Sequence, residues 1–267
     1  MPQVGLSASQ QVKQSAQYSA LSGVSSRTTA TDITERFCEP VEHQYASTGN
    51  AEELEEQLIT GWQALIARAA ETSFKDVSMA KLVDFVTALQ QRPDLGKDGQ
   101  KCTVQDMTVW KDLPLFGWQM RDAWNFAAED RSPQEQKDQW VNLNAFSAAL
   151  VAAVHSKAGD NPDLSLFCIW TVRQALEEEN FCDVSVAAAA VWFIFAAPTI
   201  RDYSRNGKSF DGKIAKGGFS YKDAGWTGFS NERWNVWQKR LGELHDQVSE
   251  KNKEVLQEAL KAIDEAS

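Results

Sequence analysis

The sequence has few of the residues that build metal centres and disulfide frameworks. The four cysteines lie far apart and never occur as Cys-x-x-Cys, so we expect reduced thiols, as is usual in cytosolic proteins. The three histidines share no metal-ligand spacing. These residues are Cys38, Cys102, Cys168 and Cys182, and His43, His155 and His245. We therefore expect no bound metal and no cofactor.

Catalytic and phosphate-binding motifs are also missing from the sequence. The fragment Gly207-Lys208-Ser209 is no phosphate loop, because Asp202 stands where the first glycine is required and an apolar helix precedes it. The run Glu177-Glu178-Glu179 lacks the form of a magnesium-binding motif and is typical of a solvated helix end. There is no Gly-x-Ser-x-Gly elbow either. No reaction class follows from these residues.

Basic residues are too few to favour a polyanionic partner. Lysine and arginine number 27 against 37 acidic residues, a net charge of −10, which argues against nucleic acid and anionic membrane surfaces. Residues 1–34 contain no signal-peptide pattern. The fourteen-residue apolar stretch 184–197 is shorter than the ~20 residues that cross a bilayer, so it predicts a buried helix. A cytoplasmic location is expected.

Apolar residues, in contrast, are abundant and recur at helical spacing. Leu54, Leu58, Trp62 and Leu65 follow at intervals of three and four, which predicts one apolar helix face. Comparable stripes, without strand-like alternation, predict an all-α fold: a single bundle-like domain of about seven helices over residues 49–267, with a tryptophan-rich core. These helices are expected to begin near residues 50, 78, 118, 133, 164, 184 and 231.

Other segments depart from that pattern. Residues 1–48 are rich in Ser, Gln, Thr and Ala without a steady period, which predicts a flexible arm, although residues 33–41 could pack on the body as an extended segment. Residues 94–114 are expected to be a loop. A long glycine-rich loop is predicted over 199–230, after a helix that Pro198 ends. The C-terminal amphipathic helix, 231–264, could dock on the body or pair with a partner.

Polar side chains lie beside large aromatics at several points of the predicted helices. Arg173 and Glu177 are one helical turn apart and can pair. Such groups either form a buried network that satisfies helix ends and loop carbonyls, or line a tryptophan-walled pocket. The first interpretation is favoured because core networks outnumber ligand sites. The candidate ligand-binding residues are Trp118, Arg121, Trp124, Trp140, Asn144, Trp170, Arg173 and Glu177.

All of these residues except Trp118 belong to a series of motifs that resembles, in this order, an uncharacterised and mainly fungal family, domain of unknown function 3632. The resemblance covers roughly residues 52–244. It implies a fungal intracellular protein with an all-helical domain, and it carries no catalytic residues. The motifs are Trp110-Lys111-Asp112-Leu113-Pro114, Arg121-Asp122-Ala123-Trp124-Asn125, Trp140-Val141-Asn142-Leu143-Asn144-Ala145-Phe146-Ser147-Ala148, Trp170-Thr171-Val172-Arg173-Gln174-Ala175-Leu176-Glu177 and Arg233-Trp234-Asn235-Val236-Trp237.

Two functions of different classes remain open from the sequence. The absence of a catalytic constellation favours a helical binding or interaction protein, with a protein partner or a second copy engaged through the C-terminal helix. The alternative is a small-molecule enzyme or carrier whose tryptophan-walled pocket is closed by the 199–230 loop. In that alternative Arg173 would hold an anionic group and Glu177 would be an acid or base. A purely structural or regulatory protein is the third hypothesis.

Overall fold

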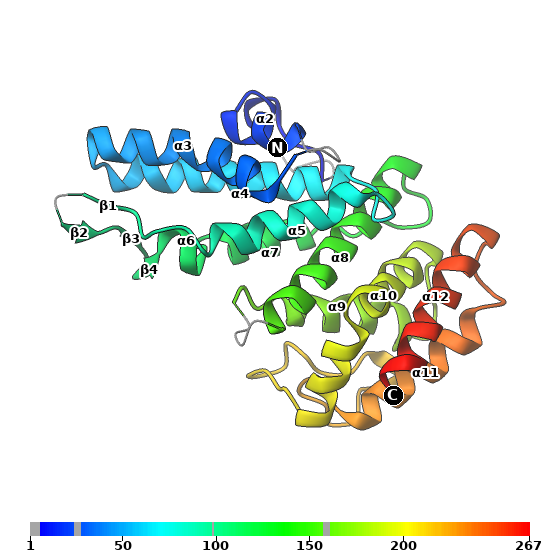
Figure 1. Ribbon diagram of the computed structural model, residues 1–267. Helices are drawn as coiled ribbons and strands as arrows, with labels where there is room; N and C mark the ends of the chain where they lie inside the picture. The colour runs from blue at the N-terminus through cyan, green and yellow to red at the C-terminus, as the bar shows by residue number, and fades with distance from the viewer. Residues whose placement is uncertain (1–5, 24–27, 98, 157–160) are drawn as a thin grey trace. The chain divides into compact units, whose positions relative to one another are not determined.

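The computed structural model describes residues 6–23, 28–97, 99–156 and 161–267. The chain divides into two compact units, Met1–Phe126 and Ala127–Ser267, where a single core was expected. Both units are predominantly helical (Figure 1), so the all-α prediction is confirmed. The described residues contain more helices than the seven that the sequence indicated.

The first unit contains seven helices and two small hairpins among its described residues. The helices are α1 (Gln10–Lys13), α2 (Ala16–Ser22), α3 (Ala30–Thr48), α4 (Ala51–Glu71), α5 (Val77–Leu89), α6 (Val109–Asp112) and α7 (Phe116–Trp124). Strand β1 (Gly96–Lys97) pairs with β2 (Gln100–Lys101), and β3 (Thr103–Val104) with β4 (Met107–Thr108), both antiparallel. These hairpins occupy the segment that was expected to be a loop. Each strand is two residues long, too short for the alternation that marks a strand in sequence.

Helix α3 differs from the flexible arm expected over residues 1–48, of which 1–5 and 24–27 lie outside the described residues. Thr29 and Asp32 form a capping box that starts the helix. Phe37 is buried and its ring lies 4.9 Å from that of Phe85 and 6.0 Å from that of Trp62. Segment 33–41 thus packs on the unit as a helix, and it supplies a centre of the aromatic core.

An ion pair reinforces this attachment of α3. Arg92 donates through Nε and Nη2 to the two carboxylate oxygens of Glu42, at 2.9 and 2.7 Å. The indole Nε1 of Trp110 donates to the same carboxylate at 3.0 Å. Hydrogen bonding to Glu42 raises the pKa of the Arg92 guanidinium above its usual value. A segment of polar composition is therefore held by a few specific contacts.

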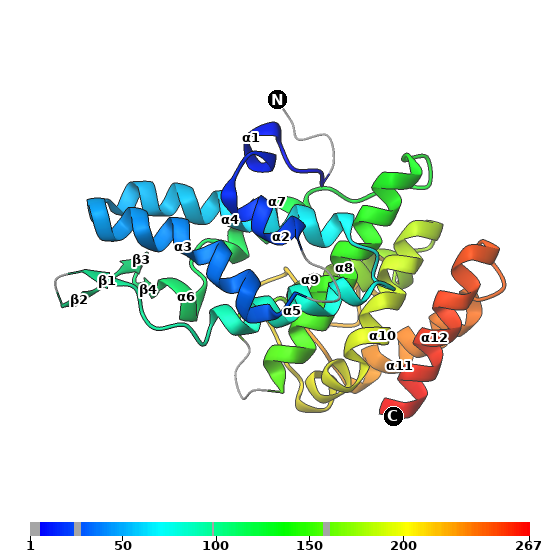
Figure 2. The ribbon, with the colours of Figure 1, turned by 45° about the horizontal axis from the view of Figure 1, so that its top comes forward.

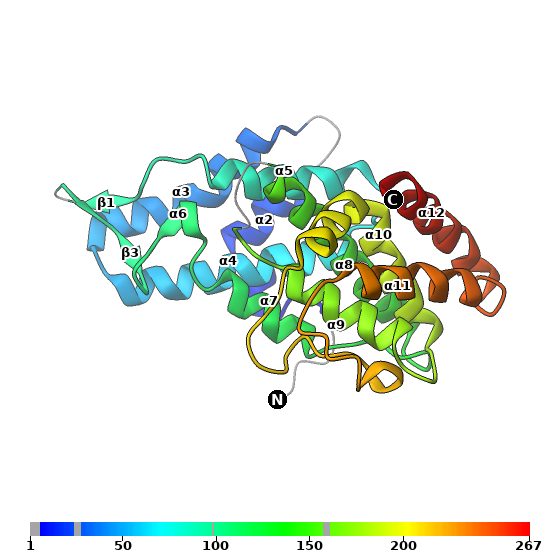
Figure 3. The same ribbon diagram turned by 90° about the horizontal axis from the view of Figure 1, so that it is seen from below.

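In the second unit, α10 (Asp183–Asn206) packs against four other helices. These are α8 (Gln134–His155), α9 (Ser165–Leu176), α11 (Asn231–Leu244) and α12 (Glu250–Ala266), as Figures 1 and 3 show. The α10 window that is long and apolar enough to span a membrane is 78% buried, as befits a core helix. The helix was expected to end at Pro198. The backbone does leave the helical conformation at Ala196, with φ −137°, but a second helical stretch continues to Asn206, so residues 199–206 of the predicted loop are helical. Proline removes one N–H and crowds the preceding turn, which explains a kink just before Pro198.

The C-terminal segment forms two helices with their apolar sides covered inside the second unit. Trp234, Trp237, Leu241 and Leu244 of α11 are buried, and so are Leu256 and Ile263 of α12. At the start of α12, Ser249 and Asn252 both donate hydrogen bonds to the Asp183 carboxylate at the start of α10. The stripe that could have paired with a partner is therefore used within the unit.

Candidate functional site

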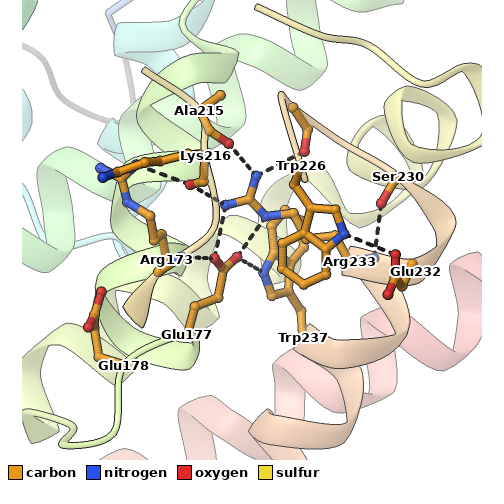
Figure 4. Close-up of polar contacts among 12 residues, drawn as sticks. Arg173, Glu177, Glu178, Ala215, Lys216, Trp226, Ser230, Glu232, Arg233 and Trp237 are labelled. Atoms are coloured by element: carbon orange, nitrogen blue, oxygen red, sulfur yellow. Dashed lines mark hydrogen bonds and ion pairs between the residues drawn. The ribbon is translucent and has the colours of Figure 1, made fainter. Parts of the chain in front are cut away.

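The second unit contains a buried ion pair between the end of α9 and the first turn of α11 (Figure 4). Arg233 Nε lies 2.7 Å from Glu177 Oε1, and Arg233 Nη2 lies 3.0 Å from Glu177 Oε2. Both side chains are 0% exposed. Burying two charges is costly unless every polar atom finds a partner, so the remaining contacts decide what this pair does.

All five N–H groups of Arg233 are engaged. Two bind Glu177, and the other three donate to the carbonyl oxygens of Ala215 at 2.7 Å, Gly228 at 2.9 Å and Lys216 at 3.3 Å. The Glu177 carboxylate accepts two more hydrogen bonds, from Trp237 Nε1 at 2.7 Å and from the Gly218 amide at 2.8 Å. Four donors thus occupy the four acceptor directions of the carboxylate.

Two tryptophan rings lie close to the Arg233 guanidinium. The Arg233 Cζ atom lies 5.1 Å from the centroid of the Trp226 ring and 5.4 Å from that of Trp237. Trp226 is held in turn by the hydrogen bond from its Nε1 to Glu232, at 3.0 Å. Cation–π contacts of this kind offset part of the desolvation of the arginine.

The glycine-rich segment between α10 and α11, residues 207–230, is held by its backbone. Besides the carbonyls on Arg233, the Ile214 carbonyl accepts from Trp170 Nε1 at 2.8 Å and from Arg173 at 3.3 Å. Arg173 also donates to the Lys216 carbonyl at 3.2 Å. Burial, together with the positive charge of Arg233, lowers the pKa of Arg173. We call residues 214–220, with the α9 and α11 side chains that bind them, the clasp.

The close approach of the segment backbone to the end of α9 requires a glycine at position 218. A Cβ on Gly218 would lie 2.7 Å from both the Cβ and the carbonyl oxygen of Glu177. The Ser220 amide donates to that same carbonyl at 3.0 Å. Gly218 is therefore explained by packing against the end of the helix, whereas a Cβ on Gly217 would clash with the carbonyl group of Tyr221 in the same segment.

The backbone of residues 214–220 faces the α9 and α11 side chains that bind it. Several side chains of the segment remain in solvent. Phe219 is 57% exposed and Ile214 is 46% exposed. The Lys222 ammonium lies 5.3 Å from the Phe219 ring centroid, and Lys213 and Lys216 are exposed nearby in sequence. The segment thus combines a fixed backbone with an outer surface of apolar and cationic side chains.

The predicted pairing of Arg173 with Glu177 is not what the structure has. Glu177 pairs with Arg233 instead, and Arg173 binds the carbonyls of Ile214 and Lys216. Two residues one turn apart are neighbours in a helix, but Glu177 is the residue that ends α9, and its side chain turns to α11. Saturated and without exposure, this carboxylate offers no free atom for acid–base chemistry.

Asn144 lies in a separate buried contact of the second unit. Its amide oxygen accepts from Thr171 Oγ1 and Trp192 Nε1, both at 2.8 Å, and its nitrogen donates to the Trp140 carbonyl at 2.9 Å. Asn144 is 0% exposed. One amide thereby joins α8, α9 and α10, which is what a core polar network does.

The other three predicted residues belong to the first unit, on α7. Trp124 is buried, whereas Trp118 is 64% exposed and Arg121 is exposed. The α7 stripe therefore splits between a core side and a solvent side. Within the second unit the structure brings Trp170, Arg173 and Glu177 into the clasp and leaves Trp140 and Asn144 in the core network.

Arg233 is the residue of this site that the sequence interpretation missed. It stands at the start of the motif Arg233-Trp234-Asn235-Val236-Trp237, where it was read only as part of a resemblance. Its partner Glu177 is 56 residues away, a distance over which one sequence gives no pairing signal. A cue was present: an arginine inside a strongly apolar helix stripe needs a buried acceptor.

Cysteine and metal chemistry add no further candidates in the described part of the chain. Burial raises the pKa of Cys168 and of Cys38 well above the usual thiol range. Among the described residues, no group of three or more histidine, cysteine, aspartate and glutamate side chains could hold a metal ion.

Comparison with protein families places the chain in a family. A family model described as Protein of unknown function (DUF3632) matches residues 62–241. The matched range contains both residues of the buried pair and the whole of segment 207–230. No curated protein and no solved structure matches the chain.

Proposed function

For this chain, which belongs to the DUF3632 family, we propose a role as a helical interaction protein that presents segment 207–230 to a partner with an acidic surface. The proposal rests on a difference between the backbone and the side chains of that segment. Its carbonyl and amide groups are bound by buried Arg233 and Glu177, whereas Ile214 and Phe219 remain in solvent. A backbone fixed before binding loses little entropy on binding.

Charge supports the choice of an acidic partner. Segment 207–230 contains four lysines and two aspartates, a net charge of +2, in a chain whose net charge is −10. Lys208 pairs with Asp163, and the other three lysines are exposed. A basic surface on an acidic protein attracts acidic partners. Exposed Phe219 beside Lys222 adds an apolar contact at the same place.

Site-specific crosslinking tests this proposal. A photoreactive phenylalanine analogue is placed at Phe219 in the full chain, and at Val77 as a control, because the two positions are 57% and 61% exposed. We expect a crosslinked partner from position 219 alone, lost in the variant Lys213→Glu/Lys222→Glu. Identical products from both positions, or a product that survives charge reversal, would contradict the proposal.

Pairing through the C-terminal helix and catalysis in a pocket would each require buried contacts of the second unit to break. Pairing through the C-terminal helix would have to uncover Trp234 and Trp237, which are 1% and 0% exposed. A pocket that uses Glu177 as acid or base would have to open its pair with Arg233. Titration of the chain with a candidate ligand, followed by amide exchange of residues 214–220, separates these cases. Protection of the segment without loss of the pair supports binding on its outer surface.

A further inference from the structure

The first unit contains a hollow of about 620 Å³ that no interpretation of the sequence had indicated. It is lined by residues of α1, α2, α3 and α4 and of the turn between α1 and α2. Figure 2 shows these four helices. A volume of this size is within the range of small-molecule sites, roughly 300–1,000 Å³. Its lining residues are Gln11, Gln14, Ser15, Ala16, Gln17, Pro40, Gln44, Glu53, Glu56, Gln57 and Thr60.

The lining of this hollow is polar and carries negative charge. Five of its eleven residues are glutamines, and two are the glutamates Glu53 and Glu56 on one side of α4. Among the described residues of the lining there is no lysine, arginine or histidine. An anionic ligand would meet two carboxylates without a compensating cation, and an apolar ligand would strip water from amides without replacing their hydrogen bonds. Both classes are disfavoured.

Three of the glutamines form a directional relay that ends on one carboxylate. Gln17 Nε2 donates to Gln57 Oε1 at 2.8 Å, Gln57 Nε2 donates to Gln44 Oε1 at 2.6 Å, and Gln44 Nε2 donates to Glu53 Oε2 at 2.7 Å. Gln17 is only 2% exposed. The relay links α2, α3 and α4, so it holds these side chains in place before any ligand arrives, and aligned amides polarise one another.

From this geometry we propose that the hollow binds a small linear organic cation with two or more ammonium groups. A primary ammonium has three N–H donors, a secondary ammonium has two, and neither has an acceptor. The hollow offers the complementary set: two carboxylates three positions apart on α4 and fixed amide oxygens around them. This site is independent of the function proposed for segment 207–230.

Calorimetric titration of the full chain with spermidine tests the proposal at about 150 mM salt, where long-range attraction is screened. A linear diol of similar length is the neutral probe. The variant Glu53→Gln/Glu56→Gln removes both charges and keeps an acceptor for Gln44. Its matched control is Glu35→Gln/Glu39→Gln, two exposed residues of α3 outside the lining, with the same change in net charge.

We expect spermidine to bind and the diol not to bind. The Glu53/Glu56 variant should weaken spermidine binding at least about tenfold, and the control variant by less than about twofold. Gln57→Leu keeps both carboxylates but cuts the relay, and it should also weaken binding while circular dichroism shows an unchanged helical spectrum. Absence of binding, equal weakening by the two glutamate variants, or equal binding of the diol would overturn the proposal. The proposal would also be overturned if a lysine-rich peptide bound and spermidine did not, since the occupant would then be a protein.

Discussion

Removing Arg233 is the sharpest test of how the second unit is held together. In Arg233→Met, the Glu177 carboxylate stays buried at 0% exposure with only two neutral donors, Trp237 Nε1 and the Gly218 amide. The carbonyls of Ala215 and Gly228 also lose the donor that now binds them. Leaving an uncompensated buried charge costs about 3–5 kcal/mol. We expect a loss of that size in the free energy of unfolding.

The first unit supplies a matched control with the same chemistry and more solvent. Arg92 binds Glu42 with the same two atoms that Arg233 uses on Glu177, and Trp110 donates to Glu42 as Trp237 does to Glu177. The side chains of Arg92 and Glu42 are 22% and 29% exposed, so water can hydrate the carboxylate in Arg92→Met. We expect a cost of about 1–2 kcal/mol for that variant.

Urea denaturation gives the free energies, and amide exchange by mass spectrometry locates the loss. Because the two compact units need not unfold together, one transition midpoint is not enough. In Arg233→Met, exchange should accelerate first in peptides covering 214–220. The double variant Glu177→Gln/Arg233→Met should recover part of the lost stability, since no charge is then buried alone. A cost no larger than that of Arg92→Met, or a double variant worse than the single one, would refute the reasoning.

Three further variants or measurements check other features of the structure. Gly218→Ala places a Cβ 2.7 Å from the end of α9 and should cost about 1–3 kcal/mol in urea denaturation, whereas Gly117→Ala, in α7 with nothing within 4 Å, should be neutral or stabilising by up to about 1 kcal/mol. Burial alone would raise the pKa of Asp130, but hydrogen bonds from Cys182 and from two amides at the start of α10 hold it below its usual value. The contribution of Asp130 to stability is therefore present above the unfolded pKa of about 3.9 and is lost as pH falls through the lower folded pKa. Asp130→Asn should flatten the acid limb of a curve of unfolding free energy against pH, and an unchanged acid limb would exclude this role. The Cys168 thiol, fully buried and with a raised pKa, should resist maleimide in the native chain and react only after unfolding, as peptide mass spectrometry would show; prompt labelling would contradict its burial.

Long apolar stripes were the most informative feature of the sequence. Leu54, Leu58, Trp62 and Leu65 predict the buried face of α4, and all four are buried. Such stripes work because one helix turn repeats every 3.6 residues whatever the helix packs against. The prediction that the C-terminal region is one helix missed its break near His245, because the apolar spacing continues almost unchanged into α12.

Weakly apolar segments and long-range pairs were beyond the sequence patterns. Helix α3 spaces Ile33, Phe37 and Val41 at intervals of four, but polar neighbours and Pro40 mask the signal. The packing of α3 on α4 depends on Gly61. A Cβ at this position would lie 2.7 Å from the ring of Phe37, so a glycine in α4 makes room for α3. That kind of information belongs to a pair of helices and appears in neither one alone.

The contacts of Glu177 and Arg233 explain why the second unit keeps a buried charge pair. A well-packed apolar pair is often as stable as a buried ion pair, so stability alone does not explain Glu177 and Arg233. Apart from η1 (Phe219–Tyr221) and an antiparallel bridge between Ser209 and Gly228, segment 207–230 is irregular. Its carbonyls at 215, 216 and 228 accept hydrogen bonds from Arg233 instead of from a helix or a sheet. One arginine supplies three such donors from a single side chain, and a glutamate is needed to balance its charge. Because an apolar residue at position 233 could bind none of these carbonyls, the ion pair is best understood as the device that gives an irregular backbone one conformation.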